Sequence, residues 1–376
     1  MVITSLLFAA TFLETPIPGD PDVAFAAFAP LPKPFGEKDR QKLAVAVRTL
    51  VDGSQEYTRR TVYNITDGRT VDVALLPDGV AVRFTVPKEN LSNGIALMDG
   101  LLRRPIVDET TLARALVRIQ RREPGYWAAA LRPLRNDVKT LKAPEARALL
   151  QRVFQPQRTV VVVAGGFTEG QAEVLWERRT ADWKLTAEPR YPDITPKPEP
   201  KDNPSGVTTV ELRGPAIKLA DPELPTRWLA LIALGVGKGS SLFRDVRQVE
   251  GWSYRQEAIL WPDAAGLVPR IVAASAPEEG EAARAEALRT ALQKSAEGWT
   301  AKDLKRALSV AELTLADGQP LGPLWLADGP VSNDLDDRAL LDAYWFAKSG
   351  SRWDATKLLS QMRAVTLDDL KATATA

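Results

Sequence analysis

A proline-rich segment divides the sequence into two parts of similar size. The segment AEPRYPDITPKPEPKDNPSG, from Ala187 to Gly206, contains six prolines. Because proline lacks a backbone N–H donor and has a fixed φ, we predict an extended, stiff connector rather than a helix. The chain has 376 residues, which is long for one hydrophobic core. We therefore expect two domains, 21–186 and 207–376, joined by the linker 187–206.

Strands and helices alternate with turn signals in both parts, and the two parts share an order of elements. This pattern predicts an α+β fold with two similar domains, each a mainly antiparallel sheet packed by helices. In the first part we expect helices at 38–50, 90–102, 109–123, 128–138, 144–154 and 168–178, a hairpin of strands 69–77 and 80–87, and a buried strand at 158–164. In the second part we expect strands at 207–212, 252–261 and 267–275, and helices at 226–234, 241–249, 280–297 and 301–315. Thr168 and Thr300 are candidate N-caps, and a further helix begins at Thr366.

Residues 1–20 form a leader or a signal segment. The apolar run Val2–Leu13 is long enough for the core of a signal peptide and too short to span a bilayer. No Lys or Arg precedes it and no small-x-small cleavage site follows, so a first strand is an equal alternative. The sequence leaves the compartment open between an exported, periplasmic protein of a bacterium and a cytoplasmic one. No other apolar stretch approaches membrane-spanning length, and we expect no stable membrane span.

Two residue types are absent from the chain. Without Cys there are no disulfides, thiolate nucleophiles or thiolate metal ligands. Without His, both Ser-His-Asp catalysis and H-x-x-E-H metal binding are excluded. The net charge of +1 provides no field that would attract nucleic acid. The remaining candidates for chemistry are carboxylates, hydroxyls, Lys and Arg.

A glycine-rich stretch, GVGKGSSLF (Gly235–Phe243), resembles a phosphate-binding loop only superficially. The order G-x-x-x-x-G-K-[ST] is absent, since Lys238 is followed by Gly239. The stretch also follows an apolar helical run, whereas a P-loop follows a strand. A turn between two helices is the favoured interpretation.

The segment after this turn, SSLFRDVRQVEGWSY (Ser240–Tyr254), contains an arginine and a tyrosine seven positions apart, Arg247 and Tyr254. Taken singly, Arg247 is typical of a cation at a helix C-terminus and Tyr254 of a half-buried strand residue. Together, the Gly-rich turn, S-S-L-F, V-R, acidic-Gly and Tyr resemble the C-terminal domain signature of the M16 peptidase family. That family includes pitrilysin-like and mitochondrial-processing-type zinc peptidases.

Flanking segments extend the resemblance over Val71 to Ala374. They are FTVPKENLSNGIALMDGLLRRPIVDETTL, VVVVAGGFTEGQAEVL, VELRGPAIKLADPE and AVTLDDLKATA. The family's zinc motif, H-x-x-E-H, is missing, because the helix expected in its place reads KDRQKLAVAVRTL. Glu123 lies near the place of the family's third ligand, but one carboxylate cannot make a catalytic zinc site. The resemblance therefore implies no metal ligands and no cofactor in this chain.

The resemblance implies a division of labour found in heterodimeric M16 members. One subunit holds the zinc, and the other supplies the Arg/Tyr pair across a cavity. In this chain Tyr254 would donate a hydrogen bond to the oxyanion and Arg247 would orient the substrate backbone. The implied partners are a zinc-binding M16 subunit and a peptide substrate, with a homodimer as an alternative when the chain is alone.

Two other functions remain open. One is a proteolytically inactive M16-like scaffold, and the other is a free-standing peptide-binding protein with a large cavity between its domains. A self-sufficient hydrolase built on Glu or Asp pairs has no supporting spacing in the sequence.

Overall fold

The computed structural model describes residues 10–32, 35–121, 140–184, 208–249, 251, 256–263, 265–275, 281–320, 322–326, 330–331 and 334–375. The chain forms two compact units, one of Met1–Pro200 with Leu335–Arg352 and one of Lys201–Asp334 with Trp353–Ala376. The structure thus places 335–352 in the first unit, whereas we expected 207–376 to form a single domain. The expected linker 187–206 lies outside the described residues.

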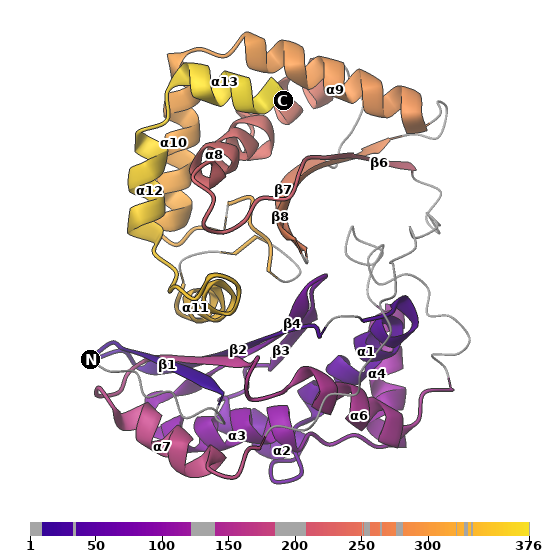
Figure 1. Cartoon of the computed structure of the whole chain (residues 1–376), viewed down its shortest axis with the longest axis vertical. Coiled ribbons are helices and arrows are strands. Elements are labelled where there is room, and N and C mark those ends of the chain that lie inside the picture. The colour runs from indigo at the N-terminus through magenta and orange to yellow at the C-terminus, as the bar shows by residue number, and fades with distance from the viewer. Residues whose placement is uncertain are drawn as a thin grey trace. The chain divides into compact units, whose positions relative to one another are not determined.

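The first unit contains a five-stranded sheet in the order β1-β5-β2-β4-β3 (Figure 1). β1 runs parallel to β5, and the other neighbours are antiparallel. The predicted hairpin is confirmed, because Leu75 pairs with Val80 on either side of the turn. The strands are β1 (Thr11–Pro16), β2 (Asp22–Pro30), β3 (Asp72–Leu75), β4 (Gly79–Pro87) and β5 (Val160–Gly165).

The central strand β2, which we did not predict from the sequence, is buried on both faces. Every residue from Val23 to Ala29 has 0% of its surface exposed. Because successive side chains point to opposite faces, the residues at 23, 25, 27 and 29 enter one hydrophobic core. Phe28 points to the other face and contacts Tyr344 edge-to-face, with ring centroids 5.0 Å apart. That face is covered by α11 (Leu335–Ser349), which comes from the far end of the sequence.

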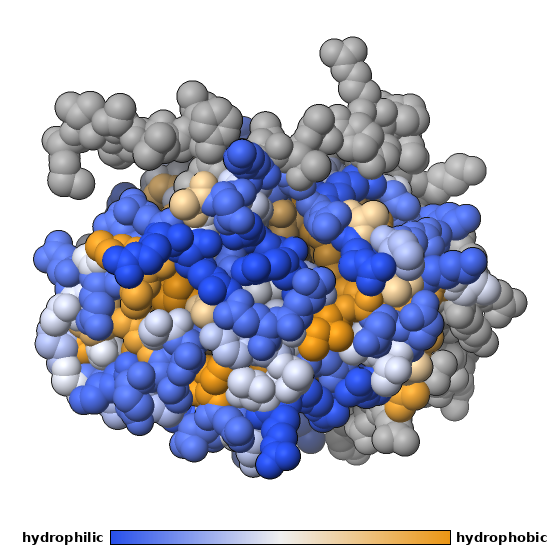
Figure 2. Space-filling model, turned by 90° about the horizontal axis from the view of Figure 1, so that it is seen from below, coloured by the Kyte–Doolittle hydropathy of each residue, from blue (hydrophilic) through white to orange (hydrophobic). Residues whose placement is uncertain are grey.

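The remaining helices of the first unit lie on the opposite side of the sheet from α11 (Figure 1). Seen from below, this helical side is mostly hydrophilic, with hydrophobic residues exposed between the hydrophilic ones (Figure 2). The expected helix 128–138 lies outside the described residues. The helices are α1 (Glu37–Thr49), α2 (Arg59–Ile65), α3 (Leu91–Arg103), α4 (Glu109–Arg121), α6 (Ala143–Val153) and α7 (Gln171–Thr180), with short 3₁₀ helices at Leu50–Asp52 and Lys88–Asn90.

The predicted N-cap of α7 is wrong. The helix begins after Gly170, which has a φ of 76°, and Thr168 lies two residues further out. The cap is supplied by the carboxylate of Glu14 in β1, which accepts hydrogen bonds from the backbone N–H groups of Gly170 and Glu173. A carboxylate is favourable there because the N-terminus of a helix carries partial positive charge.

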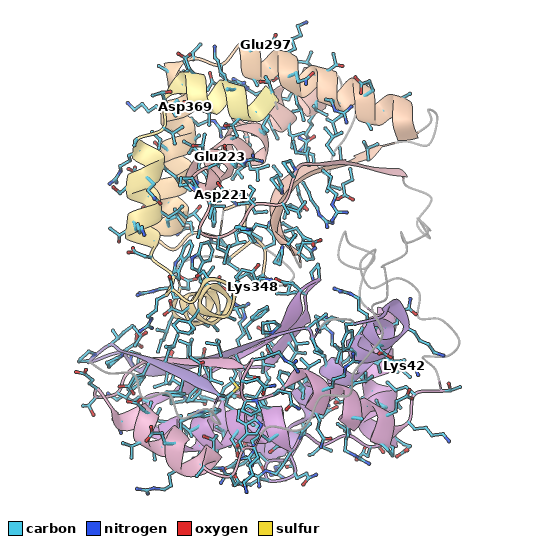
Figure 3. All side chains as sticks on the ribbon, in the orientation of Figure 1. Lys42, Asp221, Glu223, Glu297, Lys348 and Asp369 are labelled. Carbon is cyan, nitrogen blue, oxygen red and sulfur yellow. The ribbon has the colours of Figure 1, made fainter. Side chains whose placement is uncertain are left out.

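Ion pairs fasten both ends of α11 to the sheet. At its N-terminus, Arg83 of β4 pairs with Asp337 and lies 3.4 Å from Asp336. At its C-terminus, Lys348 (Figure 3) lies 2.8 Å from the carboxylate of Asp78 in the β3–β4 turn. The hydroxyl of Tyr344 donates to the same carboxylate at 3.3 Å. Since the Asp78 side chain is almost fully buried, its charge depends on these partners.

The second unit contains an antiparallel sheet, described over three strands in the order β6-β8-β7. Its strand order differs from that of the five-stranded sheet in the first unit, so the prediction of two similar domains is not confirmed. Thr300 caps α10 as predicted, in a capping box with Asp303. The elements are β6 (Thr208–Arg213), β7 (Gln256–Asp263), β8 (Gly266–Ser275), α8 (Leu224–Gly235), a π-helix (Leu242–Val249), α9 (Glu281–Glu297), α10 (Ala301–Leu315), α12 (Ala355–Arg363) and α13 (Leu367–Thr375). None of the helices in the described part of the chain is long and apolar enough to cross a membrane.

Replacing Lys348 by methionine should destabilise the first unit by about 3 kcal/mol at pH 7, because the buried Asp78 carboxylate loses its cation. The double variant Asp78→Asn/Lys348→Met should recover most of this loss. Arg69→Met removes a more exposed pair with Asp22 in the same unit, so its cost should stay below about 1 kcal/mol. Urea unfolding measures all three, and equal losses for Lys348→Met and Arg69→Met would contradict the anchoring role.

The stability of the first unit should also depend on pH through Asp78. Burial raises the pKa of Asp78 more than Lys348 and Tyr344 lower it. At pH values between the two pKa values, the folded protein holds a proton on Asp78 that the unfolded chain has already released, and the stability gained in this way is lost as the pH rises through the raised pKa. Lowering the pH from 7 to about 4 should increase the unfolding free energy of the wild type relative to Asp78→Asn. The pKa of Asp108 is lowered, chiefly by a backbone hydrogen bond from Thr111. The unfolding free energy of the wild type relative to Asp108→Asn should therefore not increase over the same pH range.

Candidate functional site

The glycine-rich turn is explained by packing. A Cβ atom added to Gly235, at the end of α8, would lie 2.2 Å from the Cβ atom of Ala258 in β7. Gly237 has a φ of 76°, which favours glycine. Arg306 of α10 donates to the carbonyl oxygens of Ala233 and Val236, at 3.0 and 2.9 Å, and so satisfies the C-terminus of α8. The turn follows a helix, as predicted, and its glycines need no bound phosphate to account for them.

The two serines of the S-S-L-F motif hold the start of the π-helix. The backbone N–H of Phe243 donates to the Ser240 hydroxyl at 3.4 Å. The indole N–H of Trp299 donates to the buried Ser241 hydroxyl at 3.0 Å. Ser241 is also hydrogen-bonded to Ser295 of α9, at 2.6 Å, and the Ser295 hydroxyl donates to the Asp245 carboxylate. These bonds tie the motif to α9 and to the loop before α10.

Arg247 lies on this π-helix, where we expected an α-helix. Its guanidinium carbon is 5.0 Å from the centre of the Phe243 ring, a cation–π distance. π-Helical turns are rare and occur often at functional sites. Gly251 has a φ of 67°, which confirms the predicted helix stop. Tyr254 lies outside the described residues, so its position relative to Arg247 stays a prediction.

The helix in the place of the zinc motif, α1, uses its arginines to bind backbone carbonyls. Arg40 donates to the carbonyl oxygens of Leu76 and Pro77 at 2.8 and 2.7 Å. Arg48 donates to Val73 of β3 at 2.9 Å. These two side chains therefore attach α1 to the β3–β4 hairpin.

A lysine of α1 also contacts a protein group. Lys42 (Figure 3) pairs with Glu145 of α6. No group of three or more His, Cys, Asp or Glu residues able to hold a metal occurs among the described residues, and Glu123 lies outside them. Because catalytic zinc requires three protein ligands of these types, α1 and its surroundings do not fit the ion.

Two buried carboxylates were not predicted from the sequence. Asp99 of α3 accepts from Arg103, Arg104 and Arg179 at 2.8–3.0 Å. Asp52 is surrounded by three other arginines. Among these ion pairs, only the one between Asp99 and Arg103 could be predicted from the sequence, because the two residues are four apart on one helix.

Comparison with known proteins finds one family that matches part of the chain. Residues 140–310 match the family described as peptidase M16 inactive domain. The sequence has no significant match among curated proteins. The fold is similar to a protease from Helicobacter pylori, with 13% identity, a TM-score of 0.74, and coverage of 98% of this chain and 95% of that one. It is also similar to a peptidase M16 inactive domain from Pseudomonas fluorescens, with 17% identity, a TM-score of 0.69 and coverage of 98% and 93%.

The periplasmic protease PqqL from Escherichia coli has the same fold over a longer chain. Its TM-score is 0.67 and its identity 14%, over 96% of this chain and 42% of that one. The family match over residues 140–310 and the shared fold together support an M16-like family member. Because the matched family is an inactive domain, the comparison supports a proteolytically inactive M16-like scaffold.

Replacing Ser241 by alanine should destabilise the second unit by about 2 kcal/mol, because the buried Trp299 N–H loses its acceptor. Urea unfolding followed by tryptophan fluorescence measures the change. Ser309→Ala removes an exposed hydroxyl from α10 and should change the stability by less than about 0.5 kcal/mol. A similar small effect for Ser241→Ala would show that the serine network does not hold the π-helix.

Proposed function

We propose that this chain is the non-catalytic subunit of a heterodimeric M16 zinc peptidase. The proposal rests on the contacts of α1. Its arginines bind backbone carbonyls at the place where the family has its zinc motif. The chain contains no His that could replace those ligands elsewhere. Any zinc and general base of the complex are therefore assigned to a partner subunit.

The contribution of this chain would be the Arg/Tyr pair. Arg247 belongs to the segment 140–310 that matches the family and lies on a short helix of unusual geometry. Its planar guanidinium suits a peptide carbonyl or carboxylate, which it would hold in position. Tyr254 would donate its hydroxyl proton in a hydrogen bond to the carbonyl oxygen as negative charge develops there. Neither role requires a metal ligand from this chain.

A proteolytically inactive scaffold is the second candidate. It is favoured by the match to an inactive domain. A scaffold would use the fold to bind or support another protein, and the Arg/Tyr pair would then have no part in hydrolysis. The two candidates make opposite predictions for substitutions of Arg247 and Tyr254.

The first experiment compares peptide hydrolysis by this protein, by an H-x-x-E-H-bearing M16 subunit of the same organism, and by their mixture. We expect hydrolysis in the mixture only. Tyr254→Phe should lower its turnover by about 10²–10³ while complex formation is retained, since an oxyanion donor is lost. Arg247→Gln should raise KM or lower turnover without dissociating the complex.

Matched controls are available in the chain. Tyr63→Phe alters an exposed tyrosine of α2, and Lys238→Gln removes one exposed positive charge from the glycine-rich turn. Both should leave turnover unchanged. If the mixture is no more active than the zinc subunit alone, the scaffold is correct and the heterodimeric peptidase is not.

A further inference from the structure

The first unit has an open depression on its helical side, separate from the segment that contains Arg247. Its volume is about 660 Å³, within the range of small-molecule sites. Arg59 of α2 and Arg114 and Arg118 of α4 line it, together with the apolar side chains Ala113 and Val117. Val117 is 42% exposed, which is high for a large apolar residue. The depression therefore combines cations with apolar surface.

The three arginines all lie close to one buried carboxylate, that of Asp52. Asp52, at the end of the 3₁₀ helix Leu50–Asp52, has only 2% of its side chain exposed. Arg118 binds both of its oxygens, at 2.8 and 3.2 Å. Arg114 lies 3.4 Å and Arg59 3.9 Å from its Oδ1 atom. Without Asp52, three guanidinium groups this close together would repel one another.

Asp52 does not occupy all the donors of these arginines. Within the described residues, Arg59 has one contact with Asp52, through Nε, and its two Nη atoms have no partner. Arg114 uses Nη1 for Asp52 and Nε for the carbonyl oxygen of Thr110, which leaves Nη2 without one. The Arg59 side chain is 63% exposed. Guanidinium donors therefore remain available at the opening of the depression.

We propose that this depression binds a monocarboxylate carried on a short aliphatic group, such as the C-terminal carboxylate of a peptide that ends in leucine. The free Nη groups of Arg59 and Arg114 hold the carboxylate, because a guanidinium matches its two oxygens. Val117 and Ala113 contact the aliphatic group. The site is independent of the proposed peptidase role, since it requires neither Arg247 nor Tyr254.

The charge balance favours a monoanion over a phosphate dianion. The three arginines contribute +3, and Asp52 with Glu109, which also lines the depression, contributes −2, which leaves +1. Asp108, just before α4, also interacts with Arg114, but it does not line the depression and is not part of this sum. One negative charge is therefore balanced at this site, whereas a second would be repelled by the neighbouring carboxylates.

The test is fluorescence anisotropy of the full chain with an N-terminally labelled peptide that ends in a free leucine carboxylate. The C-terminal amide of the same peptide should bind at least about tenfold more weakly, because a charge-assisted hydrogen bond is lost. Arg59→Gln should weaken binding of the acid by about tenfold and leave binding of the amide unchanged. Arg60→Gln, an equally charged change at the next exposed residue of α2, should have less than about a twofold effect.

Competitors distinguish the sources of the carboxylate. If isovalerate displaces the peptide, the site binds free short-chain acids. If isovalerate does not displace the peptide, but the acid peptide still binds more tightly than its amide, the site binds a peptide C-terminus. Val117→Glu, at an exposed position, should weaken both ligands. The proposal is overturned if acid and amide bind equally, if Arg59→Gln and Arg60→Gln have the same effect, or if inorganic phosphate competes better than isovalerate.

Discussion

The first unit depends on the burial of strand β2 on both faces. One face is covered by helices that are near it in sequence, and the other requires α11, which begins about 300 residues later. A sheet face of alanine, valine and phenylalanine left in water would lose the free energy of burial. The chain must therefore return to the first unit before it ends. The ion pairs of Arg83 and Asp78 define where the returning helix lies, because a buried charge is tolerated only beside its partner.

The same use of charge explains how an M16-like fold persists without zinc ligands. Arg40 and Arg48 attach α1 to the β3–β4 hairpin through backbone carbonyls. Asp99 and Asp52 each hold several arginines. Apart from Arg103 and Arg104, which lie on or next to the helix of Asp99, these cationic side chains reach from one element to another and satisfy a buried acceptor. The contacts of α1 thus arise from ordinary hydrogen bonds and do not require a metal ion.

Local patterns were sufficient to predict many elements. The Pro77-Asp78-Gly79 turn predicted the β3–β4 hairpin, and Thr300 marked the start of α10. Strand β2 was missed because its two faces are both apolar, which removes the alternation that identifies a half-buried strand. The cap at Thr168 was wrong because Glu14, distant in sequence, caps α7 instead. The helix that carries Arg247 was predicted, but its π-helical geometry was not.

The sequence alone determined that this chain has no imidazole or thiolate, and hence no zinc site of the M16 type. It also determined where most helices and strands begin, because capping residues, glycines and apolar periodicity act over a few positions. Only the tertiary structure decided that α11 belongs to the first unit and that Asp52 gathers Arg59, Arg114 and Arg118. Except for the contact of Asp52 with Arg59, these contacts join residues far apart in the chain. Their strength comes from burial, which exists only once the two segments have packed together.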